Sequence, residues 1–329
     1  MAIIPYENIY RSGNQVDELY RSGNEIVKMY RSGDLIYQKL SSAPDDSIIP
    51  LTFEIITSGT ILWKKYTNSA PDRTIQYRIN NGSWESIAAN DTAGTAINVS
   101  VGDIVQFKGN NASYSSTNYY GQACQFGGTA TFYAYGNIMS LIYGDNFIGQ
   151  NTLEENYTFV GLFRSLNGLT SHIAHKLIMP ATTLTNSCYS NMFYGTNITT
   201  APELPATNLT VACYLNMFCN TPLISAPQLP ATTLTQSCYN SMFSFCTNLT
   251  TAPELPATTL VESCYNFMFA HCSSLNYVKC LATDISATDC AKQWLDSVAE
   301  NGTFIKDSAM SSWPSGINGI PAGWTVQNA

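Results

Sequence analysis

Hydrophobic and polar residues follow a ten-residue pattern at the start of the chain. Residues 10–34 read YRSGNQVDELYRSGNEIVKMYRSGD, which is three copies of one decapeptide. In each copy an aliphatic residue precedes the tyrosine, and a second aliphatic residue follows it six positions later. Gly13, Gly23 and Gly33 supply the positive φ of a tight turn, beside turn-forming Ser, Asn and Asp. The pattern predicts one strand per copy, because a glycine every ten residues would cost a helix about 1 kcal/mol each time.

Three or four such strands bury too little apolar surface to offset the entropy of ordering them. Two interpretations follow: a terminal sheet that packs on the next domain, or an attachment segment that other chains complete. We favour the second, because exposed sheet edges invite pairing between chains. It predicts that the tyrosine and the second aliphatic residue of each copy are buried between chains, namely Tyr10, Val16, Tyr20, Ile26, Tyr30 and Ile36.

Short β-prone runs separated by Gly, Asn, Ser and Pro occupy the stretch from about residue 47 to residue 145. They include LTFEIIT, TILWKKY, TIQYRI, AINVSV and DIVQFKG, and they predict a β-sandwich. YRINNGSWESI predicts a hairpin with a type I′ turn at Asn81-Gly82. The expected core aromatic residues are Trp63, Trp84, Phe107 and Tyr133. Nothing in this segment indicates catalysis, so we interpret it as a spacer.

A longer repeat fills the second half of the chain. Pro180, Pro205, Pro230 and Pro256 recur every 25 or 26 residues, in the range of leucine-rich repeats. In the third copy Leu234, Cys238, Met242 and Phe243 have helical spacing, and Leu249-Thr-Thr-Ala-Pro predicts a short strand. A half-repeat from Tyr157 and the segment around Trp294-Leu295 look like end caps, and Trp313 and Trp324 would cover the last open face.

The sequence therefore predicts a mixed, multidomain fold. Residues 1–45 form a β-repeat segment for attachment and oligomerisation, and residues 46–150 form a β-sandwich spacer domain. Residues 151–329 form an α/β leucine-rich-repeat solenoid with terminal caps. Each repeat buries its apolar face only against its neighbours.

The ten cysteines follow the repeats. Five hold one position in successive repeats, and Cys246 and Cys272 share a second position where Thr196 and Thr221 stand in earlier repeats. A position at which Thr replaces Cys is not built for pairing, so we expect buried free thiols and assembly in a reducing cytoplasm. The five are Cys188, Cys213, Cys238, Cys264 and Cys290.

Composition narrows the classes of function. Of the 329 residues 45% are hydrophobic and 12% are charged, with a formal net charge of −8, which indicates a folded protein. Only 15 Lys and Arg are scattered along the chain, which argues against nucleic-acid binding. No apolar run has the length of a membrane span, and the first residues, MAIIPYENIYRSGN, show no secretory signal.

Candidate chemistry is sparse. His172 and His175 could lie on one helical turn, but no third metal ligand accompanies them, so we expect a chance pair and no metal site. His271 and Cys272 are adjacent and would not face each other on a helix. We therefore expect no catalytic residues, no cofactor and no enzyme activity.

The open strand side of the repeats is the expected binding face. Its hydroxyl and amide groups suit sugar hydroxyls, although a merely solvated sheet would show the same composition. The predicted binding residues are Thr199, Thr200, Ile224, Ser225, Thr250, Thr251, Asn276 and Tyr277.

The repeat unit LPATTLxxSCYxxMFxxCxxLTxAPx resembles the BspA-like leucine-rich repeats of gut Bacteroidales and of the phages that infect them. The segments YRINNGSW, GNIMSLIYGDNF and GIPAGWTV resemble the same lineage, so that the resemblance covers about 280 residues. Over about thirty residues the YRSGN decapeptides resemble N-terminal attachment segments of phage virion proteins.

The resemblance implies a structural and adhesion protein of a phage virion, a head or tail fibre or a capsid decoration. It implies a homotrimer that is assembled in the bacterial cytoplasm and attached to other virion proteins by its N-terminus. Host-surface polysaccharide or protein is the expected ligand. The alternative is a bacterial cell-surface leucine-rich-repeat adhesin, which the absence of a visible export signal disfavours; a glycan-cleaving enzyme would need a pair of carboxylates across a cleft.

Overall fold

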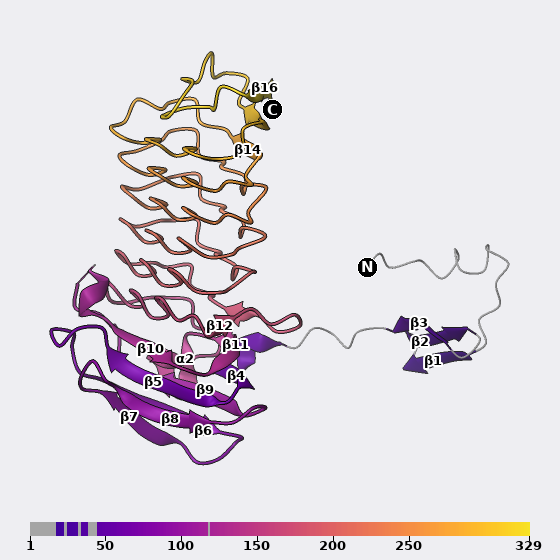
Figure 1. The fold of residues 1–329 in the computed structure, drawn as a ribbon, viewed down its shortest axis with the longest axis vertical. Helices are drawn as coiled ribbons and strands as arrows, with labels where there is room; N and C mark the ends of the chain where they lie inside the picture. The colour runs from indigo at the N-terminus through magenta and orange to yellow at the C-terminus, as the bar shows by residue number, and fades with distance from the viewer. Residues whose placement is uncertain (1–17, 23–24, 32–33, 39–44, 118) are drawn as a thin grey trace. The chain divides into compact units, whose positions relative to one another are not determined.

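The chain is mostly β-structure in several sheets, with few helices (Figure 1). The computed structural model describes residues 18–22, 25–31, 34–38, 45–117 and 119–329. The boundary between two compact units falls between Asp45 and Asp46. The boundary expected at 150/151 lies inside the second unit, where the sandwich and the repeats share one hydrophobic core.

The N-terminal unit contains a three-stranded antiparallel sheet, β1 (Glu18–Ser22), β2 (Glu25–Arg31) and β3 (Asp34–Gln38). The strands pair in chain order, with Leu19 opposite Met29. The segments between them contain Gly23 and Gly33, which the decapeptide pattern assigns to turns. The prediction of one strand per copy is confirmed for these copies; Tyr10 and Val16 lie outside the described residues.

Two sheets form the sandwich. One has the order β10-β5-β8, and the other has the order β12-β11-β4-β9-β6-β7, with β13 also paired to β11. The strand bounds are β4 Leu51–Thr57, β5 Gly59–Lys65, β6 Arg73–Ile79, β7 Glu85–Ala89, β8 Thr95–Val99, β9 Ile104–Gly109, β10 Cys124–Gly128, β11 Thr131–Asn137, β12 Leu169–Thr170 and β13 Leu177–Ile178. Short helical segments accompany them: η1 Asp46–Ile48, η2 Tyr120–Gln122, α2 Ser140–Tyr143 and η3 Gly144–Asn146.

Aromatic rings fill the space between the two sheets. Trp63 and Phe107 are fully buried, as predicted, and Phe53 stacks on Phe132 at 4.1 Å between ring centroids. The prediction is wrong for Trp84 and Tyr133, which are half-buried. Strand alternation explains Tyr133, because Phe132 before it points into the core. Trp84 instead packs under the cations of Arg78 and Lys108.

The predicted hairpin forms between β6 and β7, but its tight turn is one residue earlier than expected. Asn80 and Asn81 have φ of 50° and 61°, and the Gly82 N–H donates to the Ile79 carbonyl at 2.9 Å. The Asn80 side chain decides the position, because it accepts a hydrogen bond from the Ile104 N–H and donates one to Asp103. These contacts with Asp103 and with the first residue of β9 cannot be seen in the local sequence.

The repeats form stacked coils above the sandwich (Figure 1). Within the described residues 151–329 there is no helix, so the predicted helical segments are wrong. In each coil a run of turns carries three left-handed positions, four residues apart. These are Tyr157, Gly161, Ser165; Ser187, Asn191, Gly195; Ala212, Asn216, Asn220; Ser237, Ser241, Phe245; Ser263, Phe267, His271; and Asp289, Gln293, Ser297.

Successive N–H groups in each coil alternate between acceptors in the same coil and acceptors in the next coil, which explains why turns replace a helix. In one coil the Met192 N–H donates to the Tyr189 carbonyl of the same coil at 3.2 Å. The Tyr189 N–H donates instead to the Cys213 carbonyl of the next coil at 3.0 Å. A helix would use every N–H internally and leave nothing to join the coils. The run of turns in each coil, which we call the turn ribbon, gives the backbone N–H groups hydrogen-bond acceptors and links neighbouring repeats at the same time.

Identical residues stack in columns through the coils. Tyr189 and Tyr214 stack at 5.9 Å between ring centroids, and Phe193 and Phe218 stack at 5.5 Å. Cys188 and the four cysteines equivalent to it are buried, and all ten cysteines are free, as predicted. The Thr221 hydroxyl lies 3.4 Å from the Cys246 sulfur, which confirms the shared Thr/Cys column.

Each end of the stack is covered. At the first coil the Phe126 N–H of the sandwich donates to the Leu162 carbonyl at 2.9 Å, so the sandwich is the first cap. At the last coil Trp294 occupies the methionine position, and Trp313 stacks on it at 5.2 Å. The expected strands are mostly reduced to single bridges. At this end a three-stranded parallel sheet forms from β14 Tyr277–Cys280, β15 Gly302–Lys306 and β16 Trp324–Asn328.

Candidate functional site

The predicted binding residues come from equivalent positions of four successive coils. Thr200 forms a parallel bridge with Ser225, and Thr251 forms one with Tyr277. All eight are exposed except Thr199, which is half-buried. The register therefore brings them into two adjacent rows on one side of the stack, which we call the strand face: Thr199, Ile224, Thr250 and Asn276 in one row, and Thr200, Ser225, Thr251 and Tyr277 in the other.

Backbone hydrogen bonds join two pairs of neighbouring coils at these rows. The Ile224 N–H donates to the Thr199 carbonyl at 3.0 Å, and the Asn276 N–H donates to the Thr250 carbonyl at 2.9 Å. The side chains are thereby fixed at the ends of rigid coils and directed to solvent. Hydroxyl and amide groups in such rows can donate and accept hydrogen bonds along an extended ligand.

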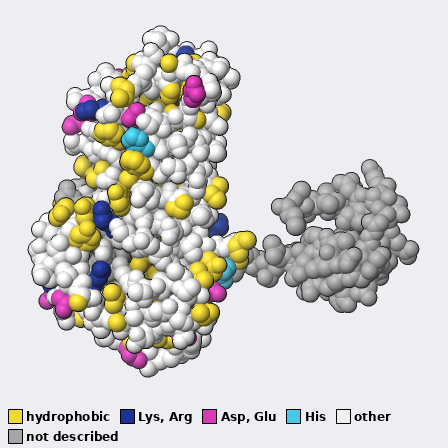
Figure 2. Space-filling model, in the orientation of Figure 1, with side chains coloured by type: hydrophobic (Ala, Val, Ile, Leu, Met, Phe, Trp, Pro, Cys, Tyr) yellow, Lys and Arg dark blue, Asp and Glu magenta, His cyan; other side chains and the backbone are white. Residues whose placement is uncertain are grey.

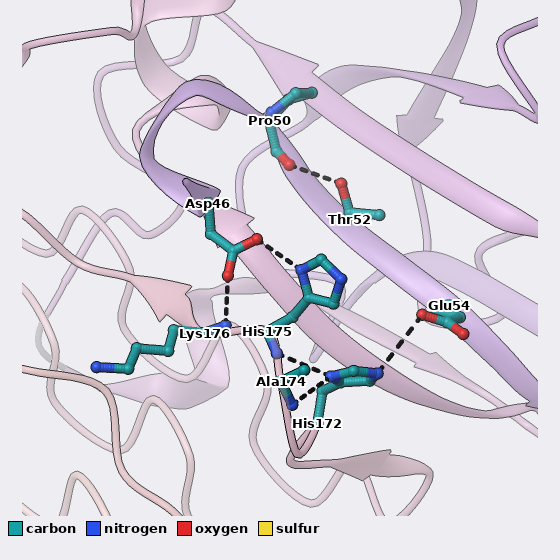
Figure 3. A network of polar contacts seen from close by, with 8 residues as sticks. All are labelled: Asp46, Pro50, Thr52, Glu54, His172, Ala174, His175 and Lys176. Atoms are coloured by element: carbon teal, nitrogen blue, oxygen red, sulfur yellow. Dashed lines mark hydrogen bonds and ion pairs between the residues drawn. The ribbon is translucent and has the colours of Figure 1, made fainter. Parts of the chain in front are cut away.

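A loop between β12 and β13 lies beside the first coils and contains both predicted histidines. The Nδ1 atom of His172 accepts two hydrogen bonds, from the N–H groups of Ala174 and His175, at 2.9 and 2.8 Å (Figure 3). The His172 Nε2 faces the Glu54 carboxylate at 3.9 Å. The ring of His172 therefore closes the turn of the loop, and its nitrogens are already engaged.

A buried carboxylate holds the other end of this loop. Asp46, which is 3% exposed, bonds His175 Nδ1 at 2.7 Å and accepts a hydrogen bond from the Lys176 N–H at 2.6 Å (Figure 3). The Tyr135 ring stacks on His175 at 4.2 Å. Burial raises the pKa of Tyr135, and the carboxylates of Glu54 and Asp46 raise it further. The histidines brace a loop whose apex residue, Ile173, is fully exposed.

A groove of about 720 Å³ lies between this loop and the first coils. Leu177, Ile178 and Ile198 are among its apolar walls, and the hydroxyl-bearing residues Ser171 and Thr200 also line it. Lys176 and Glu203, which line it as well, form an ion pair at 3.0 Å. Thr200 belongs to the strand face, so the groove adjoins the end of that face nearest the sandwich.

Sequence reasoning missed the loop and its groove, although a signal was present. The chain has four more residues between Leu169 and Pro180 than between the equivalent Ile198 and Pro205. An insertion at one repeat is typical of a surface loop with a separate role. Reading the histidines only as metal ligands hid this insertion.

Candidate metal ligands and cysteine thiols bear on the chemistry that the described part of the chain can carry out. Its His, Cys, Asp and Glu side chains form no group of three or more that could hold a metal ion. Burial raises the pKa of Cys188 and Cys238 to about 12, and it raises the pKa of Cys272 well above its usual value. These thiols are protonated at neutral pH and are poor nucleophiles. The surface drawn in Figure 2 is mostly uncharged, with scattered hydrophobic groups.

The predicted oligomerisation residues lie in the N-terminal unit. Tyr20 is in β1, Ile26 and Tyr30 are in β2, and Ile36 is in β3. Tyr10 and Val16 are outside the described residues. Contacts of these residues between chains stay a prediction.

No protein-family model, curated protein or solved structure matches this chain. Among the residues that the structure describes, no helix combines the length and the apolar character needed to cross a membrane.

Proposed function

We propose that this chain is a structural and adhesion protein of a phage virion, a fibre or a capsid decoration, with no enzymatic activity. Its N-terminal repeats attach it to other virion proteins, and its coils present the strand face to polysaccharide or protein on the host surface. The observation that carries the proposal is the periodicity of this face. The same two positions recur on successive coils and are exposed in every case except Thr199, so a ligand made of repeating units can contact successive coils in the same way.

Rigidity supports a binding role for the strand face. Its residues are attached to coils that are joined by backbone hydrogen bonds and filled by stacked rings. A surface that is already ordered loses little conformational entropy when it binds, so several weak hydrogen bonds add up. The adjoining groove offers an apolar subsite next to the same rows.

We interpret the array as a leucine-rich-repeat solenoid of the BspA-like kind, on the strength of its 25- or 26-residue period and its columns of Leu, Tyr and Phe. Turn ribbons take the place of the usual helical return. The position in a virion and the homotrimer rest on the resemblance of the decapeptides to virion attachment segments.

Paired substitutions test the strand face in the full-length chain. Thr200→Val with Thr251→Val removes two hydroxyls and keeps the shape and the strand preference. Each lost hydrogen bond costs about 1 kcal/mol, so binding to host cells should weaken roughly 30-fold. The matched control is Thr232→Val with Thr258→Val, two threonines that are also exposed but lie outside the face, and this variant should bind like the parent.

Equal binding by both pairs of variants and the parent would contradict a role for the strand face. Antibody labelling of purified particles and of uninfected cells tests the location. Label on particles supports the virion proposal, and label only on cell envelopes supports a bacterial adhesin.

A further inference from the structure

A guanidinium group lies among tyrosines where the sandwich meets the first coil. The Arg164 Cζ is 3.8 Å from the ring centroid of Tyr120 and 4.5 Å from that of Tyr194 in the next coil. Tyr66 of the sandwich is a third neighbour, at 5.7 Å. All four side chains are half-buried, so the cluster reaches the surface.

The hydrogen-bonding capacity of Arg164 is largely unused. A guanidinium has five N–H donors, but Nη1 has only two long contacts, to Tyr66 Oη at 3.5 Å and to Ser165 Oγ at 3.4 Å. Nε is buried and has no hydrogen-bond partner among the described residues. Within the same part of the chain no carboxylate forms an ion pair with it, whereas Lys65, Lys108 and Lys176 all have one. A ligand from solvent cannot reach the buried Nε, so an incoming anion would pair with the Nη donors of the guanidinium.

The same edge of the array continues through the third left-handed position of each coil. Gly195, Asn220, Phe245 and His271 occupy it in successive coils, joined by hydrogen bonds from one coil to the next. We call the surface from Arg164 and Tyr194 to Phe245 and His271 the aromatic ridge. Gly195 has no side chain and leaves the surface open beside Tyr194.

Phe245 is at this position against its conformational preference. Its φ is 62°, which is unfavourable for a bulky side chain, and it is 47% exposed. Asn220, at the same position one coil earlier, is a residue type that tolerates this conformation. Phe245 stacks on the half-buried ring of His271 at 4.3 Å between ring centroids, so the exposed Phe245 ring is held in place at the surface.

We propose that the aromatic ridge binds an acidic polysaccharide. The rings of Tyr194 and Phe245 pack against sugar faces, Asn220 bonds sugar hydroxyls between them, and Arg164 pairs with a carboxylate or sulfate group. This inference rests on the proposed function and specifies its ligand. The net charge of −8 repels anions as a whole, so selective binding of an acidic polymer requires a local cation such as Arg164.

Matched polymers test the ridge with the full-length chain. We would measure dissociation constants by biolayer interferometry for dextran sulfate against dextran, and for polygalacturonate against its methyl ester. We expect at least tenfold tighter binding of the acidic member in one pair, and the pair identifies sulfate or carboxylate as the anion. Equal affinity for the acidic and neutral members of both pairs would overturn the proposal.

Variants locate the binding. Arg164→Gln should abolish the preference for the acidic polymer, and Arg164→Lys should restore only part of it, because an ammonium lacks the planar fork. Phe245→Asn should weaken binding at least fivefold with unchanged or higher thermal stability, so its effect cannot come from misfolding. Val211→Asn, which replaces another exposed apolar residue outside the ridge, is the control. If Arg164→Gln and Phe245→Asn both bind the acidic polymer like the parent, the proposal that the aromatic ridge binds this polymer is wrong. The proposed function would still stand in that case if host-cell binding depends on Thr200 and Thr251.

Discussion

At a left-handed turn position, the difference in stability between a glycine and an alanine variant has the opposite sign from the difference expected in a helix. Ser237 has φ of 56°, and its N–H donates to the Glu262 carbonyl of the next coil at 3.1 Å. Substitution by Gly or by Ala removes the same hydroxyl and keeps this hydrogen bond. The difference in stability between the two variants therefore reports the backbone conformation.

The expected magnitude follows from two opposing effects. A Cβ in the left-handed region costs about 1–2 kcal/mol, which glycine avoids. Glycine also loses more conformational entropy on folding, which lowers the stability of the glycine variant relative to the alanine variant by about 0.4–1 kcal/mol. Ser237→Gly should therefore be more stable than Ser237→Ala by about 0.5–1 kcal/mol. In a helix the order would be reversed by about 1 kcal/mol.

Urea denaturation of both variants, followed by tryptophan fluorescence, measures the difference. The neighbouring exposed Gln236 is the control, because it is not among the left-handed positions. There Gln236→Ala should be more stable than Gln236→Gly by about 0.5–1 kcal/mol. The reasoning is refuted if alanine is the better residue at both positions.

Two further predictions concern the thiols and the N-terminal unit. Burial raises the pKa of Cys188 to about 12 from the ~8.5 of an exposed thiol. Its contribution to stability is therefore complete below about pH 8.5 and is lost as the pH rises through 12. The free energy of unfolding should fall over that pH range. Ellman's reagent should not react with the native chain at pH 8. Rapid reaction there, or native disulfides between cysteines of successive coils in non-reducing mass spectrometry, would contradict the packing of the cysteine column. Removal of residues 1–45 should leave a folded monomer, whereas light scattering should give the full-length chain about three times its mass of 36.0 kDa; a full-length monomer would contradict oligomerisation through this unit.

Local patterns in the sequence were enough for several features of the fold. The decapeptide glycines separated the strands of the N-terminal unit, and the repeat period placed Cys188 and its equivalents in one column. The Thr/Cys alternation at Thr221 and Cys246 correctly indicated unpaired thiols. The strand-face residues were placed on one surface by the period alone, because equivalent positions of stacked repeats must align.

The conformation of the return segment needed the tertiary structure. Leu234, Cys238, Met242 and Phe243 have a spacing that fits a helix and also fits a ribbon of turns four residues long. Local propensity cannot separate the two, because the choice depends on where the N–H groups of each coil find acceptors. Those acceptors are carbonyl groups about 25 residues away in the next coil.

What the sequence determined by itself was the division into repeats and the alignment of equivalent residues, since both follow from periodicity. Only the tertiary structure decided which elements touch across distant parts of the chain. It placed Asp46 against His175, made the sandwich the cap of the first coil, and brought Arg164 between Tyr120 and Tyr194. These contacts join residues from different patterns, and no single period relates them. Their energies depend on packing and burial, which exist only once the coils are stacked.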